Sequence, residues 1–414
     1  MSNIVHTSAY QPKVFPYNGS ATPSQIDRAQ EISSGLTSER TKVEELGTDG
    51  IVDWIDSIPS VTPTLRQMEY GEMNFFNQLA NQAVASSSVE LKDFKTTQVS
   101  IAAYETDEDD NFLGTTWYPN LRLTGFSLNL ADPNALIERN FTFIGEDKIV
   151  YQGNNQYLIY LEHTMVSGET GSVDIVIGSG DYADYPSPVL DPDTSGTYFD
   201  SIIRVRSGTA TELVFGTDYT YNSGTDTITI VSAAVGDVVK CYYTATTYIT
   251  GEVPFTSNTS DLGAIRADSA SLYLGSGNYL YKLQSATLDV SWERNDVKEL
   301  GNSEVVARGV NDITTTITLG RVVATYTLDE VLRGESADYG KIDVREFAND
   351  IVFYIYIYSD KTKDTFKIGY KLKDLSASAL DDGATINDYL TEGNTLTGEE
   401  GMIADNIAEL VAYT

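Results

Sequence analysis

The chain has 414 residues, of which 60 are acidic and 27 basic, so its formal net charge at neutral pH is −33. This charge argues against a protein that binds nucleic acid by neutralising phosphates, because like charges repel. A halophilic host could produce the same acidity for solubility alone. Hydrophobic residues make up 41% of the chain and 27 residues are tyrosines, which favours β-rich globular domains over disorder.

The scarcity of Cys and His limits the available chemistry. One cysteine, Cys241, excludes an intramolecular disulfide framework, and its neighbours predict a strand residue. With two histidines, His6 and His163, a histidine-based triad or multi-histidine metal site is nearly excluded. No apolar run approaches the roughly 18 residues that span a bilayer, and the first twenty residues lack a signal-peptide pattern. We therefore expect no membrane segment, and synthesis and retention in the cytoplasm unless another protein carries the chain out.

In chain order, residues 1–25 contain three prolines among Ser, Asn and Tyr, which predicts an extended arm that needs a partner to become ordered. A first domain is predicted over residues 26–165. Strands are predicted within it at Val99–Ala103 and Leu121–Leu130. A helix is also predicted, because an apolar stripe at helical spacing indicates a core-facing side. The stripe consists of Phe75, Phe76, Leu79, Ala80 and Ala83.

Residues 166–265 are rich in Gly, Ser, Thr and Asp and carry short β runs between turn residues. The runs are Val173–Ile177, Ile202–Val205, Leu213–Phe215, Thr227–Val231 and Val238–Tyr243. Their spacing predicts a small immunoglobulin-like β-sandwich, inserted between two other domains. Because folds tolerate insertions at exposed loops, we expect the sandwich to project outward.

A second domain is predicted over residues 266–414. Two of its strands alternate apolar and polar residues, the pattern of a half-buried strand. Their predicted core faces are Ala286, Leu288, Val290 and Trp292 in the first, and Ile313, Thr315, Ile317 and Leu319 in the second. Residues 324–332 change to a helical period. The run Ile351–Tyr358 is apolar on both sides and predicts a strand buried on both faces.

Much of this pattern occurs twice. Seven residues between Gln30 and Gly47 are identical to residues between Gln284 and Gly301 at a constant offset of 254, where average composition predicts roughly one. Further matches follow at neighbouring offsets. At an offset of 252, Val61 and Leu65 correspond to Ile313 and Ile317. At an offset of 253, Thr142 corresponds to Thr395 and Glu146 to Glu399. A register held over this span predicts a tandem duplication of one domain.

No group of residues predicts catalysis. The acidic run Asp107, Glu108, Asp109 and Asp110 could hold calcium, but it lacks the spacing and glycine of a calcium loop. A solvated or subunit-contacting loop is the simpler interpretation. Glu39 with Arg40 and Glu293 with Arg294 recur in both copies, which favours a structural role. We therefore expect no enzyme activity, no metal and no cofactor.

The repeated turns Glu45-Leu46-Gly47 and Glu299-Leu300-Gly301 each place an apolar residue at an exposed position. The leucine could staple its own hairpin or contact the adjacent domain. We favour the contact, because a repeated assembly needs the same surface at every junction. Together with the acidic loop, these turns are the predicted subunit-interface residues.

The motif ERxxVxELG, followed by a β-branched strand, a short helix and a strand pair, resembles the tail tube (major tail) protein family of tailed bacteriophages. The resemblance covers both copies, about 270 residues. It implies a mainly β fold, with two tandem tail-tube-type β-sandwich domains, each with one flanking α-helix, and an inserted immunoglobulin-like sandwich. Two features depart from the family pattern: the opening strand Glu31–Ser38 is poorly apolar, and the extra domain lies between the copies.

The resemblance also implies a function: a structural protein of the virion tail that assembles into trimeric, pseudo-hexameric rings stacked into a tube. Its partners would be further copies of itself, a tape measure protein, a tail terminator and a baseplate or tip, with double-stranded DNA passing through unbound. Twenty-four strands tilted by about 40° give a barrel about 48 Å across, wide enough for duplex DNA. Three chains carry about −99, which would repel DNA from the wall. On this model the insert is dispensable for assembly.

Two other function classes remain open. A receptor-binding or surface-layer adhesion protein would use the inserted sandwich as its functional part. A carbohydrate-active enzyme such as a depolymerase would need paired carboxylates flanked by aromatic residues, and the sequence shows no such pair apart from the repeats. Electron microscopy separates these classes, because tubes or trimeric rings are expected of the first function alone.

Overall fold

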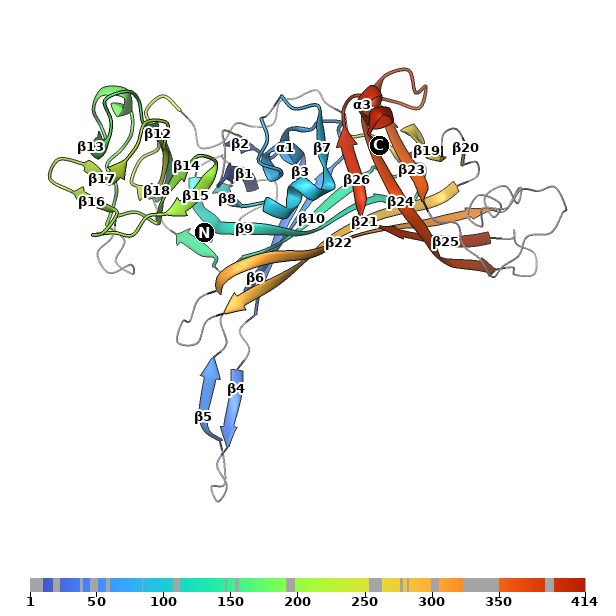
Figure 1. Ribbon diagram of the computed structural model, residues 1–414, viewed down its shortest axis with the longest axis horizontal. Coiled ribbons are helices and arrows are strands. Elements are labelled where there is room, and N and C mark those ends of the chain that lie inside the picture. Colours follow the sequence, from blue (N-terminus) through green and yellow to red (C-terminus); the bar gives the residue numbers. More distant parts are fainter. Residues whose placement is uncertain are drawn as a thin grey trace, which may run out of the picture. The chain divides into compact units, whose positions relative to one another are not determined.

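The computed structural model describes residues 10–17, 23–37, 40–44, 51–56, 60–83, 85–106, 112–145, 147–152, 156–190, 198–252, 263–275, 278–280, 283–298, 305–322, 350–383 and 391–413. Strands dominate this part of the chain (Figure 1), which confirms the predicted mainly β class. The chain divides into two compact units. The first is formed by Met1–Ile26, Gln98–Asn120 and Asp147–Asn258, and the second by Asp27–Thr97, Leu121–Glu146 and Thr259–Thr414.

The first unit contains a sheet built from distant parts of the chain. Its strands are β1 (Tyr10–Pro16), β2 (Ser24–Gln25), β8 (Val99–Thr106), β11 (Ile149–Gln152) and the start of β9 (Phe112–Leu130). Strand β1 pairs along its whole length with β8 and also pairs with β2. Val14 and Phe15 are buried in it. The predicted arm over residues 1–25 is therefore wrong for residues 10–16, which find their strand partner within the same chain.

The same unit contains a two-layer β-sandwich. Its strands are β12 (Tyr157–Thr164), β13 (Gly171–Val176), β14 (Ser201–Arg206), β15 (Thr209–Glu212), β16 (Tyr219–Asn222), β17 (Thr227–Ala233) and β18 (Val238–Ala245), with a 3₁₀ turn, η3 (Gly180–Tyr182). The sheets are β12-β18-β14-β15 and β13-β17-β16, and apolar side chains fill the space between them. Because β12 pairs with β18 along its length, the sandwich begins before residue 166, the predicted boundary.

The strand order of the sandwich differs from the predicted immunoglobulin-like arrangement. In the immunoglobulin constant fold, the first, second, fifth and fourth strands share one sheet. Here the first, seventh, third and fourth do so. Spacing of β runs along the sequence identifies a sandwich but does not determine which strands become neighbours.

An aromatic cluster attaches the sandwich to the sheet of β1, β8, β9 and β11. From that sheet come Phe15, Tyr17, Ala102, Tyr104, Trp117 and Tyr151, and from the sandwich Leu158, Ile203, Val205 and Tyr242. The ring centroids of Trp117 and Tyr242 lie 5.3 Å apart. The Lys240 ammonium is also buried and donates to the Pro16 carbonyl at 2.8 Å. The sandwich is therefore fixed to this sheet by buried side chains as well as by the connecting chain, and its outward projection stays a prediction.

The second unit contains the longer strands. These are β3 (Ala29–Thr37), β4 (Arg40–Glu44), β5 (Ile51–Asp56), β6 (Ser60–Met68), β7 (Ser88–Glu90), β10 (Glu138–Ile144), β19 (Ala270–Leu274), β20 (Asn278–Tyr279), β21 (Leu283–Lys298), β22 (Val305–Val322), β23 (Ile351–Tyr358), β24 (Phe366–Gly383), β25 (Thr391–Gly398) and β26 (Glu400–Ala404). The helical elements are α1 (Asn74–Leu79), η2 (Leu91–Thr96), η4 (Ala267–Ser269) and α3 (Ile407–Ala412). Among these described residues, no helix is long and apolar enough to cross a membrane.

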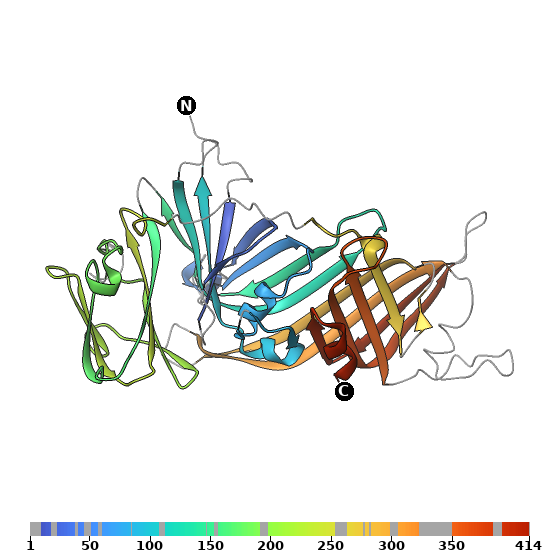
Figure 2. The ribbon, with the colours of Figure 1, turned by 90° about the horizontal axis from the view of Figure 1, so that it is seen from above.

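Eight of these strands form one continuous antiparallel sheet, in the order β3, β6, β10, β9, β21, β22, β25, β24. One face is buried, including both predicted core faces of β21 and β22. Figure 2 shows α1 and η2 lying over this face. Phe76 of α1 packs on Phe126 with ring centroids 5.4 Å apart, and Phe94 of η2 packs on Trp292 at the same distance. The predicted helix is thus present, although Ala83 lies beyond its end and is exposed.

The first four strands of this sheet repeat as the last four. Strands β3, β6, β10 and β9 correspond to β21, β22, β25 and β24, and β1 and β8 correspond to β19 and β23 in their pairing. Register irregularities recur at equivalent places: after Ala29 and Leu283, and after Val43 and Val297.

A third shared irregularity involves a side chain. The bulge between β9 and β10 has its counterpart between β24 and β25. In the first, Thr124 donates its hydroxyl to the Thr142 carbonyl at 3.1 Å; in the second, Ser378 donates to the Thr395 carbonyl at 3.2 Å. β-bulges are specific local features, so their recurrence supports the duplication.

Two details of the predicted second copy change. Leu65 pairs with Ile32 in the first copy, and Leu319 pairs with Ala286 in the second. Both residues of the second pair lie 254 positions after those of the first. The predicted correspondence of Leu65 with Ile317, at an offset of 252, is therefore wrong. Strand β23 buries one face, while Tyr354 and Tyr356 on the other remain half-exposed, so burial on both faces is also wrong. The predicted helix over residues 324–332 lies outside the described residues.

Candidate functional site

The predicted interface residues all lie outside the described part of the chain. Glu45, Leu46 and Gly47 fall between the paired ends of β4 and β5, and Glu299, Leu300 and Gly301 between those of β21 and β22. The acidic loop Asp107–Asp110 falls between β8 and β9. Their roles therefore remain predictions, and the site is built from the strands that flank them.

The centre of the eight-stranded sheet is a junction between the two copies. The last strand of the first copy, β9, pairs with the first strand of the second, β21, from Gly125 opposite Ser291 to Leu130 opposite Ala286. Six consecutive residue pairs form this ladder. The copies are therefore joined head to tail, each presenting a different edge to the junction.

Two side chains of β21 fasten this junction. Trp292 is buried and donates its indole N–H to the Leu91 carbonyl of η2 at 3.1 Å. Arg294 donates Nε to the Leu123 carbonyl at 2.6 Å and reaches the carbonyls of Phe94 and Lys95 at 3.1 and 3.3 Å. One guanidinium thus gathers three backbone acceptors of the first copy, which accords with the structural role predicted for Arg294.

A hydrogen bond to a buried ion pair also links the copies. Glu69 and Arg139 of the first copy are fully buried, with Arg139 Nε 3.5 Å from Glu69 Oε2. Tyr370 of the second copy donates its hydroxyl to the same carboxylate oxygen at 2.9 Å, and the Gly71 amide donates to the other at 2.8 Å. Desolvation and the nearby carboxylate raise the pKa of Tyr370 well above its usual value, so it stays a donor.

The sheet has two outer edges that correspond to the two sides of the internal junction. In the described part of the chain, β3 pairs with β6 alone, and the C-terminal part of β24, from Ser376 to Gly383, pairs with β25 alone. Strand β3 is the counterpart of β21, and this part of β24 is the counterpart of the part of β9 that meets β21. The two outer edges can therefore pair with each other, between two subunits, in the way that β21 pairs with β9 within one chain.

The face of the sheet opposite α1 and η2 is polar and rich in hydroxyl groups. It carries Ser33, Thr62, Thr64, Ser127, Asn129, Asn140, Thr142, Thr287, Ser291, Thr314, Thr316, Thr318, Thr395 and Thr397. A shallow groove crosses it over the internal junction, between Asn140 and Thr316. Such a surface is wettable, and its described residues show no concentration of positive charge.

Charged residues on this face are mostly acidic. They include Glu31, Glu138, Asp289, Glu293 and Asp312. Arg66 lies between Glu31 and Glu138, 3.5 Å from a carboxylate oxygen of each, so its charge is compensated. Desolvation raises the pKa of Asp289, which lies in the groove.

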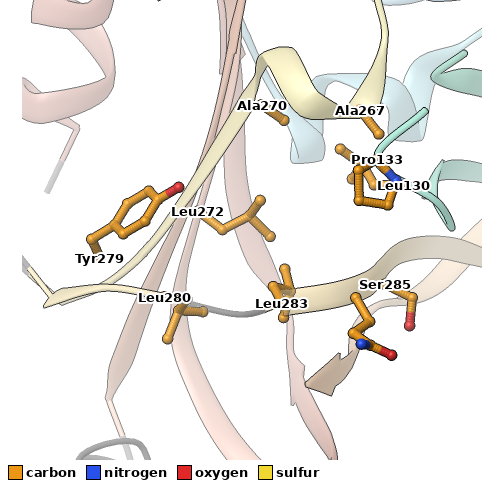
Figure 3. Close-up of a pocket in the computed structure, with 10 residues that line it drawn as sticks. Leu130, Pro133, Ala267, Ala270, Leu272, Tyr279, Leu280, Leu283 and Ser285 are labelled. Carbon is orange, nitrogen blue, oxygen red and sulfur yellow. The ribbon is translucent and has the colours of Figure 1, made fainter. Parts of the chain in front are cut away.

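A cavity lies at one end of the internal junction (Figure 3). Leu130 and Pro133 line it from the first copy, beside Ala267, and Leu272 and Leu283 line it from the second. Among the described residues of the lining there is no carboxylate, imidazole or thiol, and Tyr279 contributes the one phenol.

The cysteine and the described histidine both lie in the sandwich. Cys241 is a buried strand residue, as predicted, and burial raises the pKa of its thiol. His163 contacts the Tyr182 hydroxyl through Nδ1 at 2.7 Å and Glu169 through Nε2 at 3.1 Å. Across the described ranges, no group of three or more His, Cys, Asp or Glu residues is placed to hold a metal ion.

No protein-family model matches the chain, and no curated protein matches it. Among solved structures, it is similar to a chain of the sheath-tube complex of PVC, an extracellular contractile injection system, in its extended state. The two are 14% identical, and the match covers 36% of this chain and 98% of that one, with a TM-score of 0.28. A likeness at this level carries no argument about function.

Proposed function

We propose that the protein is a structural component of a phage tail: three copies close into a ring, and the rings stack into a tube for passage of double-stranded DNA. The role is structural rather than catalytic. It places the protein in the virion tail after synthesis in the host cytoplasm, with the tape measure, terminator and baseplate or tip proteins as partners. The observation that carries the proposal is the internal junction between β9 and β21.

The junction supports ring closure because it is heterologous. When one edge of a unit binds the opposite edge of the next, repetition gives either a closed ring or an open helix. The chain carries one such junction inside it and leaves the equivalent edges, β3 and the C-terminal part of β24, at its two ends. Three eight-stranded sheets joined in this way make the 24-stranded barrel that the tail-tube resemblance implies.

The faces of the sheet support the polar side as the inner wall. Helix α1 and η2 pack on the apolar face, so a closed barrel keeps that face outside and turns the hydroxyl-rich face inward. Serine and threonine side chains hydrogen-bond to water and carry no charge that would bind phosphate. The uncompensated carboxylates repel the phosphates of DNA. DNA would therefore slide along this wall without specific binding.

A designed cross-link tests the register of ring closure. At the internal junction Ser127 lies opposite Asp289, and the offset of 254 converts this pair to Asp381 opposite Gly35 of the next subunit. Gly35→Cys with Asp381→Cys should therefore form intermolecular cross-links under mild oxidation or with a short bismaleimide. The native thiol, Cys241, is buried and adds little background. On a denaturing gel, the covalent trimer should be the largest abundant product.

The matched control moves one cysteine by two positions along the same strand. Gly35→Cys with Gly383→Cys keeps the alternation of faces but breaks the register, so it should cross-link much less. Equal yields from both pairs, or a ladder running beyond the trimer, would contradict the proposed closure. Negative-stain images of concentrated wild-type protein should show rings or tubes.

A further inference from the structure

Strand β11 of the first copy corresponds to β26 of the second. β11 pairs with the first part of β9, and β26 pairs with the first part of β24. Both partner strands turn at a non-glycine residue with a positive φ angle, Asn120 at 48° in β9 and Asp374 at 55° in β24, which lie 254 positions apart. The residues opposite Val150 and Ile403 are also 254 positions apart. Val150 and Ile403 therefore occupy equivalent places in the two copies.

The outer edge of β26 is covered by a strand of the first copy. Strand β7 pairs with β26, with Val89 opposite Ile403, and Figure 1 shows the two strands side by side. Both side chains are buried, each with 1% of its surface exposed. Leu91 of η2 continues this contact, because a Cβ atom on Gly401 would lie 2.8 Å from its Cδ1. The copies are therefore joined by a second strand pairing, in addition to that of β9 with β21.

In the first copy the equivalent edge carries an exposed apolar side chain. Among the described strands, β11 pairs with β9 alone. Val150, the counterpart of the buried Ile403, is 44% exposed. The outer edge of a strand presents backbone N–H and C=O groups with which another chain can pair. In the described part of the chain, the first copy thus has this edge and its apolar residue but no strand that covers them.

The sequence contains a counterpart of the covering strand. Residues 89–94 read Val-Glu-Leu-Lys-Asp-Phe and residues 342–347 read Ile-Asp-Val-Arg-Glu-Phe, so all six positions keep their chemical class at an offset of 253. The second segment lies outside the described residues, and the correspondence is one of sequence. At this offset, the pairing of Val89 with Ile403 translates into a pairing of Ile342 with Val150.

The order of the copies identifies the molecule that supplies this strand. Within the chain, the strand that covers β26 comes from the copy that precedes it, since β7 belongs to the first copy. In a ring of head-to-tail copies, the first copy of one subunit is preceded by the second copy of the neighbouring subunit. The strand that covers β11 is therefore expected from a second molecule of this chain.

We propose that the outer edge of β11 is a docking site for a neighbouring copy of this chain, whose residues 341–343 add to it as an edge strand. The inference rests on the proposed ring and gives it a second contact, separate from the pairing of β24 with β3. In strand addition, main-chain hydrogen bonds supply affinity and alternate side chains supply specificity. Burial of Val150 against Ile342 fixes the register, because a slip of one residue would turn the apolar side chains to opposite faces.

The register is tested with Val150→Cys and Ile342→Cys in one chain. Directly opposed residues on antiparallel strands have Cβ atoms about 5 Å apart, within reach of a short bismaleimide. The expected products on a denaturing gel are intermolecular, up to a covalent trimer. The matched control is Val150→Cys with Val344→Cys, which moves one cysteine by two positions along the segment and should cross-link much less.

The contribution of the Val150 side chain is tested in the Gly35→Cys/Asp381→Cys protein. Val150→Asp should raise the protein concentration for half-maximal cross-linking about tenfold, because it puts a charge where an apolar contact forms. Val176→Asp is the matched control, since it adds the same charge to a sandwich side chain that is 38% exposed. It should change that concentration by less than about threefold. Both variants should melt within a few degrees of the parent.

These measurements separate strand addition at β11 from ring closure itself. If Gly35→Cys/Asp381→Cys gives a covalent trimer but Val150→Cys/Ile342→Cys does not, or closes only within one chain, strand addition is wrong and the ring stands. The same conclusion follows if Val150→Asp associates like the parent. If neither cysteine pair cross-links between chains, the ring is wrong and the inference fails with it.

Discussion

Replacing residues 166–265 with a short Gly/Ser linker is expected to give insoluble or aggregated protein. The deletion removes β14 and β18, and with them Ile203, Val205 and Tyr242, which cover Phe15 and Trp117. It also leaves β12 without its strand partner. Exposing two aromatic side chains returns on the order of 300 Å² of apolar surface to water. At about 25 cal/mol/Å² this costs about 7.5 kcal/mol, comparable with the whole stability of a typical domain.

Point variants separate this effect from the size of the deletion. Trp117→Ala, at the centre of the aromatic cluster, should lower the free energy of unfolding by about 3–5 kcal/mol. Val214→Ser changes a sandwich side chain that is 61% exposed and should be neutral within about 0.5 kcal/mol. Denaturant titrations measure both. Soluble deletion protein that melts like the full chain would show that the sandwich is only an appendage.

Arg139→Met is expected to destabilise the subunit by about 3–5 kcal/mol, because it leaves the Glu69 carboxylate buried without its cation. Tyr370 and the Gly71 amide still donate to that carboxylate, but neither carries a charge. The variant should lose cooperativity between the copies, since the pair and Tyr370 come from different copies. Thermal unfolding followed by circular dichroism measures the change.

The double variant Glu69→Gln/Arg139→Met removes both charges and should recover a large part of the lost stability. The control is Lys373→Met, which breaks a partly exposed pair in which Lys373 Nζ lies 2.6 Å from Glu400. Exposed pairs contribute about 0–1 kcal/mol, so this variant should melt close to wild type. Equal losses from Arg139→Met and Lys373→Met would mean that burial of the first pair has no energetic consequence.

Alternation of residue types predicted the faces of β21 and β22 correctly, because one face of each is buried and the other bears hydroxyl groups. The same two-residue period left the alignment of the two copies ambiguous by two residues. A shift of two residues keeps every side chain on its own face, so offsets of 252 and 254 fit the pattern equally well. The bulges that fix the offset depend on strand pairing, which composition does not encode.

Other features depend on long-range contacts. Strand β1 was predicted as part of an unpartnered arm, since its partner β8 lies about ninety residues further along the chain. Arg294 was recognised as a repeated residue, but its acceptors are backbone carbonyls, which every residue type supplies. The strand order of the sandwich could not be predicted from the sequence either. The sequence therefore predicted the repeated unit and the buried faces of its strands. The sheet edges, the contacts of Arg294 and the pairing between the copies became known from the tertiary structure.

Carrying two copies on one chain changes the entropy of ring formation. Association of separate molecules costs several kcal/mol of translational and rotational freedom for each one immobilised. Because β9 and β21 pair within the chain, three of the six junctions in a trimeric ring form during folding, at the high effective concentration of a tethered partner. Assembly then immobilises three bodies in place of six. The two kinds of junction are also free to diverge, as Trp292 and its counterpart Ser38 already have.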